Sequence, residues 1–117
     1  DWDMCTRGDP LLDLANLVIY WSEESDSALW RMAVYIPTDK PGFPSRAELV
    51  ERYAHKTGFD VSRFGWYEIF GTFKVAVILQ QIYIRYLRGQ TQDERFAILG
   101  QRVNALIRKC EELIARG

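Results

Sequence analysis

Cysteine and histidine are scarce in this chain, which limits the metal and redox chemistry that it can support. The 117 residues include two cysteines, Cys5 and Cys110, and one histidine, His55. No Cys-x-x-Cys pair and no cluster of cysteine with histidine occurs, so a zinc site is not predicted. Nothing requires a disulfide between two cysteines so far apart in the sequence. We therefore predict a reduced pair of thiols and a cytoplasmic location.

An excess of charge of either sign is also lacking. The chain has 15 Lys and Arg against 16 Asp and Glu, which gives a net charge of -1. A protein that holds a nucleic-acid backbone needs a basic surface, so nucleic acid is not expected as a partner. The most apolar stretch, residues 69–84, contains Lys74, Gln80 and Gln81 and is too short and too polar to cross a bilayer. We interpret it as a core helix and expect no membrane partner.

Hydrophobic side chains are abundant, at 48% of the residues, which favours a packed unit over a disordered segment. They recur at steps of three and four, the spacing of one helical face. The helices predicted in this way cover residues 10–21, 45–56 and 66–87, with a last helix that opens at Thr91 or Asp93. Residues 27–35 form either a short helix or an irregular apolar segment. The fold class is mainly α: a bundle of four to five helices in a single domain, residues 1–117.

Local signals mark where these helices begin and end. Asp9 followed by Pro10 is a helix start, because aspartate caps free N–H groups and proline suits the first helical position. Ser45, with Glu48 three residues later, fits the capping box. Gly58 and Gly89 are predicted stops, since glycine tolerates the left-handed backbone there.

Four aspartates within the first thirteen residues form the most informative pattern. The segment reads Asp-Trp-Asp-Met-Cys-Thr-Arg-Gly-Asp-Pro-Leu-Leu-Asp-Leu-Ala, with acids at positions 1, 3, 9 and 13. Mg²⁺ prefers oxygen ligands and usually takes one or two protein carboxylates together with phosphates and water. A carboxylate beside a helix start is a natural place for such a site.

This segment resembles the metal-binding segment of the aminoglycoside phosphotransferase / choline kinase family. The resemblance rests on Asp-Trp-Asp, on Gly-Asp-Pro-x-x-Asp-Leu-Ala and on an apolar helix that ends in Tyr-Trp. Later residues, including Pro-Gly-Phe-Pro at 41–44 and Gly-Trp-Tyr-Glu at 65–68, extend it over most of the chain. It implies the helical C-terminal lobe of a protein-kinase-like fold. It also implies an ATP- and Mg²⁺-dependent transfer of phosphate to a small-molecule hydroxyl.

The same resemblance assigns roles to the aspartates. Asp1 matches the residue that holds Mg²⁺ against the nucleotide phosphates. Asp13 matches an aspartate that supports the catalytic loop, and its apolar neighbours suggest that it is at least partly buried. Asp3 stands where the family more often has glutamate and receives no metal contact. For Asp9, helix capping is a full explanation.

The other parts of such an enzyme cannot be located in this sequence. A nucleotide-covering loop, a phosphate-binding lysine and a catalytic-loop aspartate and asparagine would precede Asp1. We therefore expect a fragment of a larger phosphotransferase, inactive by itself, with ATP and Mg²⁺ bound in the parent and not tightly here. Enzymes with this form of the motif include some associated with acyl-CoA dehydrogenase-like proteins, so the resemblance allows a hydroxyacyl-CoA as acceptor.

Other residues have an ordinary structural interpretation beside a functional one. Glu23, Glu24 and Asp26 form either a solvated acidic loop or a contact for a positively charged substrate. His55 is expected to be a surface or packing histidine. The aromatic residues Trp21, Trp30, Trp66, Tyr67 and Phe70 are expected in the core, although some could line an acceptor pocket, and Cys110 falls on an apolar stripe.

A rival hypothesis belongs to another class of protein. The chain could be a stand-alone helical interaction module that binds a partner through apolar surface and performs no chemistry. In either case, apolar surface left uncovered would favour self-association.

Overall fold

The computed structural model describes residues 7–116, and within that range all regular structure is helical. Five α-helices and two short 3-10 helices follow one another along the chain, in agreement with the predicted mainly α bundle. They are α1 (Pro10–Tyr20), α2 (Ala28–Ala33), η1 (Pro37–Asp39), α3 (Arg46–Thr57), α4 (Phe64–Leu87), η2 (Glu94–Ile98) and α5 (Leu99–Arg116). No helix in this range is long and apolar enough to cross a membrane.

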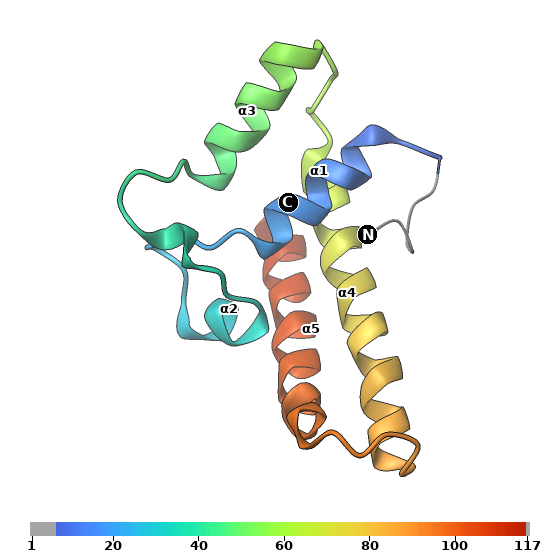
Figure 1. Ribbon diagram of the computed structural model, residues 1–117. Helices are drawn as coiled ribbons and strands as arrows, with labels where there is room; N and C mark the ends of the chain where they lie inside the picture. The colour runs from blue at the N-terminus through green and yellow to red at the C-terminus, as the bar shows by residue number, and fades with distance from the viewer. Residues whose placement is uncertain (1–6, 117) are drawn as a thin grey trace.

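The two longest helices, α4 and α5, lie antiparallel and form the frame of the molecule (Figure 1). Gly89 follows α4 with a φ of 74°, a left-handed conformation that glycine adopts without strain. The chain then returns through η2, and Gly100 in the first turn of α5 lies against Tyr83 of α4. A Cβ atom at position 100 would come within 2.9 Å of the Tyr83 ring, so a larger residue there would require this ring to shift.

Helix α1 packs across α4 and brings the amino-terminal part of the chain onto the frame. Gly71 of α4 faces Ala15 and Ile19 of α1, where an added Cβ would lie 3.6 Å from both side chains. The core then has two neighbouring clusters. One joins α1, α2, α4 and α5 (Ile19, Ala33, Val34, Val75, Ala76, Ala105 and Leu106), and the other joins α1 to the start of α4 (Leu11, Leu14, Ala15, Val18 and Phe64).

Helix α3 stands apart from the other helices (Figure 1) and has no buried residue. Its ends are as predicted: Ser45 accepts a hydrogen bond from the Glu48 amide at 3.1 Å, and Gly58 ends the helix with a φ of 75°. Val50 and Tyr53 are its partly buried contacts with the core.

The prediction that residues 69–84 form a core helix is wrong for the outer face of α4. Trp66 and Phe70, expected in the core, are exposed, and Phe73 and Val77 are exposed beside them. The reason is that only α1, α5 and η2 pack on α4, so one face of the helix has no cover among the described residues. Cys110, in contrast, is buried as predicted.

Candidate functional site

Asp9 fixes the start of α1 to the first turns of α4. One carboxylate oxygen accepts a hydrogen bond from the Leu11 amide at 3.0 Å, and the other accepts one from the Tyr67 hydroxyl. The bond from Tyr67, and then that from Leu11, lowers the pKa of the Asp9 carboxyl. The same bond raises the pKa of the Tyr67 hydroxyl. The predicted capping role of Asp9 is therefore confirmed, and Tyr67 adds an anchor that the sequence did not reveal.

Asp13 lies one turn further along α1, and its side chain is exposed. The expectation that it is partly buried is wrong. The buried face of α1 consists of Leu11, Leu14, Ala15, Val18 and Ile19, and position 13 falls outside that stripe. Its supporting role stays a prediction, and so does the Mg²⁺-binding role of Asp1. Asp1 lies outside the described residues, as do Asp3 and Cys5. Within residues 7–116, no group of three or more His, Cys, Asp or Glu side chains could hold a metal ion.

The acidic loop after α1 is tied to the start of α3. Asp26 accepts two hydrogen bonds from the Arg46 guanidinium, at 2.8 Å and 2.5 Å, and one from the Glu23 amide at 3.0 Å. Burial raises the pKa of Asp26, but the bonds from Arg46 and Glu23 outweigh it and leave this pKa below its ordinary value. Asp26 is thus a structural partner of Arg46 and is not free to meet a substrate.

Glu23 has a similar structural role, whereas Glu24 does not. The Glu23 carboxylate accepts a hydrogen bond from the Arg46 amide at 2.6 Å and lies 3.3 Å from the guanidinium. Glu24 uses only its backbone carbonyl, which accepts a bond from Arg31 at 3.0 Å, and its side chain is exposed. Of the three predicted substrate-side acids, Glu24 is the one whose carboxylate remains available.

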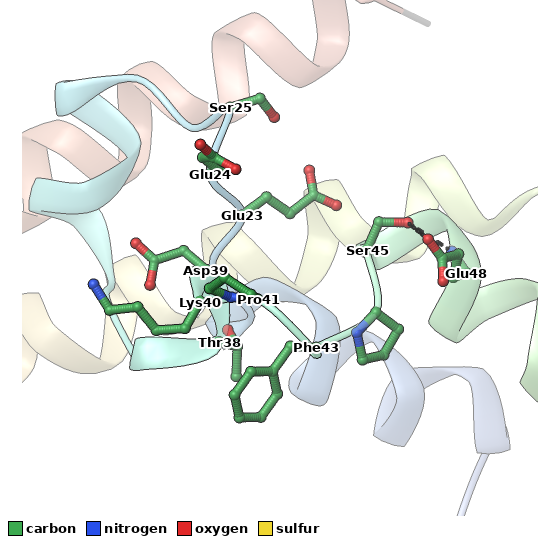
Figure 2. A pocket seen from close by; sticks show the side chains of 11 residues that line it. Glu23, Glu24, Ser25, Thr38, Asp39, Lys40, Pro41, Phe43, Ser45 and Glu48 are labelled. Carbon is green, nitrogen blue, oxygen red and sulfur yellow. Dashed lines mark hydrogen bonds between the residues drawn. The ribbon is translucent and has the colours of Figure 1, made fainter.

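An open hollow of about 560 Å³ lies beside this loop. Figure 2 shows its lining, which includes Glu23, Glu24, Asp39, Lys40, Phe43 and Glu48. Asp39 is held in place by Arg31 at 2.6 Å, and this contact, together with a bond from Tyr35, lowers the pKa of the Asp39 carboxyl. Of its four acids, Glu23 and Asp39 are already paired with Arg46 and Arg31. Glu24 and Glu48 remain, with Lys40 beside them, and this small excess of negative charge favours a positively charged group in the hollow.

The most unusual charged residue of the structure is Lys109. Its side chain is only 1% exposed, and its amine donates to the Ile19 carbonyl at 3.3 Å and lies 4.6 Å from the centre of the Trp30 ring. Burial, and then the charge of Arg46, lowers the pKa of Lys109 to about 8, although Glu68 and Asp26 act in the opposite direction. Burial also raises the pKa of Glu68.

The burial of Lys109 is unexpected for a lysine near the end of a helix. The signal in the sequence that could have revealed it is its spacing: position 109 follows Leu106 by three residues and precedes Leu113 by four, on the apolar stripe. His55 is exposed, as expected for a surface histidine. The residues that the structure brings together are therefore Asp26, Arg46, Trp30, Lys109 and Glu68, a charge network that joins α2, α3, α4 and α5.

Fold and site together define a small helical unit organised around that network, and comparisons relate it to much longer proteins. Acyl-CoA dehydrogenase family member 11 of Mus musculus is 33% identical over 96 residues, which are 80% of this chain and 12% of that protein. Family member 10 of Mus musculus is 32% identical over 94 residues, 80% of this chain and 9% of that protein. Family member 11 of Gallus gallus is 30% identical over 119 residues, 99% of this chain and 15% of that protein. No family model and no solved structure matches the chain.

These relatives correct the family expected from the opening motif. They are named as members of the acyl-CoA dehydrogenase family, and not as aminoglycoside phosphotransferases or choline kinases. The motif in residues 1–15 is short, and short acidic patterns beside a helix start carry less information than an alignment over 80% of the chain. The chain spans 9–15% of the length of the three relatives described above.

Proposed function

We propose that the chain is the substrate-side region of a larger enzyme that transfers the γ-phosphate of ATP to the hydroxyl group of a small molecule. In this proposal Asp1 binds Mg²⁺ and Asp13 supports a catalytic loop that the rest of the enzyme supplies. The 117-residue chain itself then has no transferase activity, because it lacks a nucleotide-binding part.

The observation that carries the proposal is the geometry at the start of α1. Asp9 is bonded to both Leu11 and Tyr67, which fixes the direction of the helix. Asp13 is then presented one turn further on, exposed and without a hydrogen bond or ion pair in the described part of the chain. A carboxylate that is fixed in position and accepts no hydrogen bond of its own can accept bonds from the N–H groups of a loop that packs against it.

For the acceptor, we propose a hydroxyacyl-CoA. The support is the name of the relatives, which belong to the acyl-CoA dehydrogenase family. The acidic hollow next to Glu24 favours a cationic acceptor instead, so a hydroxylated amine is the alternative that an assay must include.

The test is phosphate transfer from ATP by the full-length protein that carries this segment, in the presence of Mg²⁺, with a hydroxyacyl-CoA and with a hydroxylated amine. We expect the full-length protein to transfer phosphate to the hydroxyl group of the hydroxyacyl-CoA, and we expect no transfer by the 117-residue chain alone. Asp1→Asn should abolish transfer, and Asp13→Asn should lower kcat about 10- to 100-fold, the usual cost of losing a supporting group. Glu51→Gln, which changes an exposed acid of α3, is the matched control and should leave the rate unchanged.

Activity of the short chain would overturn the statement that it lacks a catalytic part. A full-length protein that transfers phosphate to neither acceptor would overturn the proposal and favour the interaction module. If phosphate were transferred only to the hydroxylated amine, and Glu24→Gln lowered the rate of this transfer, the acceptor site would be assigned to the acidic hollow.

A further inference from the structure

The outer face of α4 is an apolar stripe that no described element covers. Trp66, Phe70, Phe73 and Val77 follow one another at steps of four, three and four, and they are 60%, 41%, 52% and 40% exposed. In Figure 1, α4 below its crossing with α1 forms the edge of the molecule, with α5 on its other side. The Trp66 and Phe70 rings stack, with centroids 5.4 Å apart, so this end of the stripe is ordered.

The width of the stripe indicates what kind of surface it fits. Over residues 66–77, at 3.6 residues per turn, the four exposed apolar side chains of α4 fall within an arc of roughly 60°; Leu87, further along the helix, lies outside it. A helix that lies on a membrane, or that faces a broad core, usually shows an apolar arc of about 100° or more. A narrow line at steps of three and four is typical of the seam between two packed helices.

The charges beside the stripe indicate the chemistry of the partner. Basic residues recur every eleven positions along α4 and its N-cap, at Arg63, Lys74 and Arg85. Eleven residues are close to three full helical turns, so the three side chains line up along one flank of the stripe. None of them forms an ion pair in the described structure. The single acid of α4, Glu68, lies on the inward side, where it interacts with Lys109.

A second copy of this chain does not match that pattern. If two α4 helices packed antiparallel, their basic flanks would lie on the same side and Lys74 would face its own counterpart. If they packed parallel, each basic flank would meet the opposite flank of the other α4, which carries no acid. Neither arrangement supplies negative charge to the three cations.

We propose that the α4 stripe is a docking site for an amphipathic helix that carries an apolar seam and a row of Asp or Glu on one flank. Hollows at both ends of the stripe provide space for its larger side chains. One, of about 680 Å³, is lined by Trp66 and Ile114 among others, and the other, of about 490 Å³, by Ile84 and Arg85 among others. This interaction does not depend on phosphate transfer.

Two designed helical peptides of about 20 residues test the proposal with the whole chain. Both carry the same leucine seam; one has Glu and the other Lys along one flank. Isothermal titration should show binding of the Glu peptide and about tenfold weaker binding of the Lys peptide, because each of three exposed ion pairs contributes about a factor of two. Lys74→Glu combined with Arg85→Glu should reverse this preference.

Two single variants distinguish binding at the α4 stripe from nonspecific hydrophobic binding elsewhere on the surface. Phe73→Asp should abolish binding of both peptides, whereas Met32→Asp, at an apolar position of α2 that is 54% exposed, should leave it unchanged. Far-ultraviolet circular dichroism of each variant checks that the helices are retained.

Four results would overturn the proposal. The first is that neither peptide binds. The second is that both peptides bind equally and the charge-reversal variant changes neither affinity. Light scattering shows a dimer that Phe73→Asp dissociates, which would assign the stripe to a second copy. Vesicles of phosphatidylserine and phosphatidylcholine bind the chain and Phe73→Asp releases it, which would assign the stripe to a lipid surface.

Discussion

Trp30 of α2 connects this short helix to both α3 and α5. Its ring has Arg46, Lys109 and Arg116 at 5.1 Å, 4.6 Å and 4.8 Å from its centroid, and its indole N–H donates to Glu112 at 2.5 Å. The face of an indole ring attracts cations, and its N–H needs an acceptor when buried. One residue of the short helix α2 therefore holds the start of α3 and the end of α5 in place.

Lys109 should make the stability of the chain depend on pH in the alkaline range. Its folded pKa of about 8 lies below the ordinary value of 10.5, so between these two values the unfolded state binds more protons. The free energy of unfolding should therefore rise with pH above about 8, by up to about 3 kcal/mol for the full shift. Urea unfolding at pH 7.5, 8.5 and 9.5 would measure it. In Lys109→Met this rise should disappear; equal slopes in both proteins would contradict the assignment.

Arg46 should contribute far more to stability than the exposed arginine Arg95. Its side chain is 12% exposed and that of its partner Asp26 is 6% exposed, so Arg46→Met leaves a buried carboxylate without its main donor. We expect a loss of about 3 kcal/mol in the free energy of unfolding. Arg95 pairs with Asp93 at the same distance of 2.5 Å but is 87% exposed.

Arg95→Met is therefore the matched control, and its unfolding midpoint in urea should hardly change. If the two variants lost similar stability, the Arg46 network would be no stronger than a surface ion pair.

At the scale of elements, the ends of the helices are the part of the fold that the sequence predicts best. Asp9, Ser45, Gly58 and Gly89 act through their own backbone neighbours, so their effect can be read from a few adjacent residues. The face that each helix buries was harder to predict. Asp13 was placed inward because its neighbours are apolar, yet burial follows the helical stripe and not the nearest residues in sequence.

The contact of α1 with α4 allows a prediction about Gly71. A Cβ atom there would lie at 3.6 Å from Ala15 and Ile19, an ordinary van der Waals distance. Gly71→Ala should thus stabilise the chain by about 0.5–1 kcal/mol, because alanine has the higher helix propensity and its methyl group would not clash with α1. Thermal unfolding would measure the gain. Gly65→Ala, also in α4 but with nothing within 4 Å, should give a similar gain. A loss for Gly71→Ala with a gain for Gly65→Ala would mean that the two helices pack more tightly than described.

At the scale of the whole molecule, the charge network could not be predicted because it depends on residues far apart in sequence. Asp26 and Arg46 are separated by 20 residues, and Trp30 and Glu112 by 82. The acidic loop therefore looked like a solvated run or a substrate contact, although two of its three acids bind Arg46. The outward Trp66 and Phe70 were missed for the same reason: their exposure depends on which helices pack around α4.

The antiparallel pair of α4 and α5 also has a consequence for how the chain reaches its native state. These two helices follow each other in sequence and share the most extensive helix contact, with only the turn at Gly89 and η2 between them. Closing a short loop costs little chain entropy, and topologies rich in local contacts fold fast. The hairpin can therefore form early, and α1, α2 and α3 can then add to a surface that is already in place.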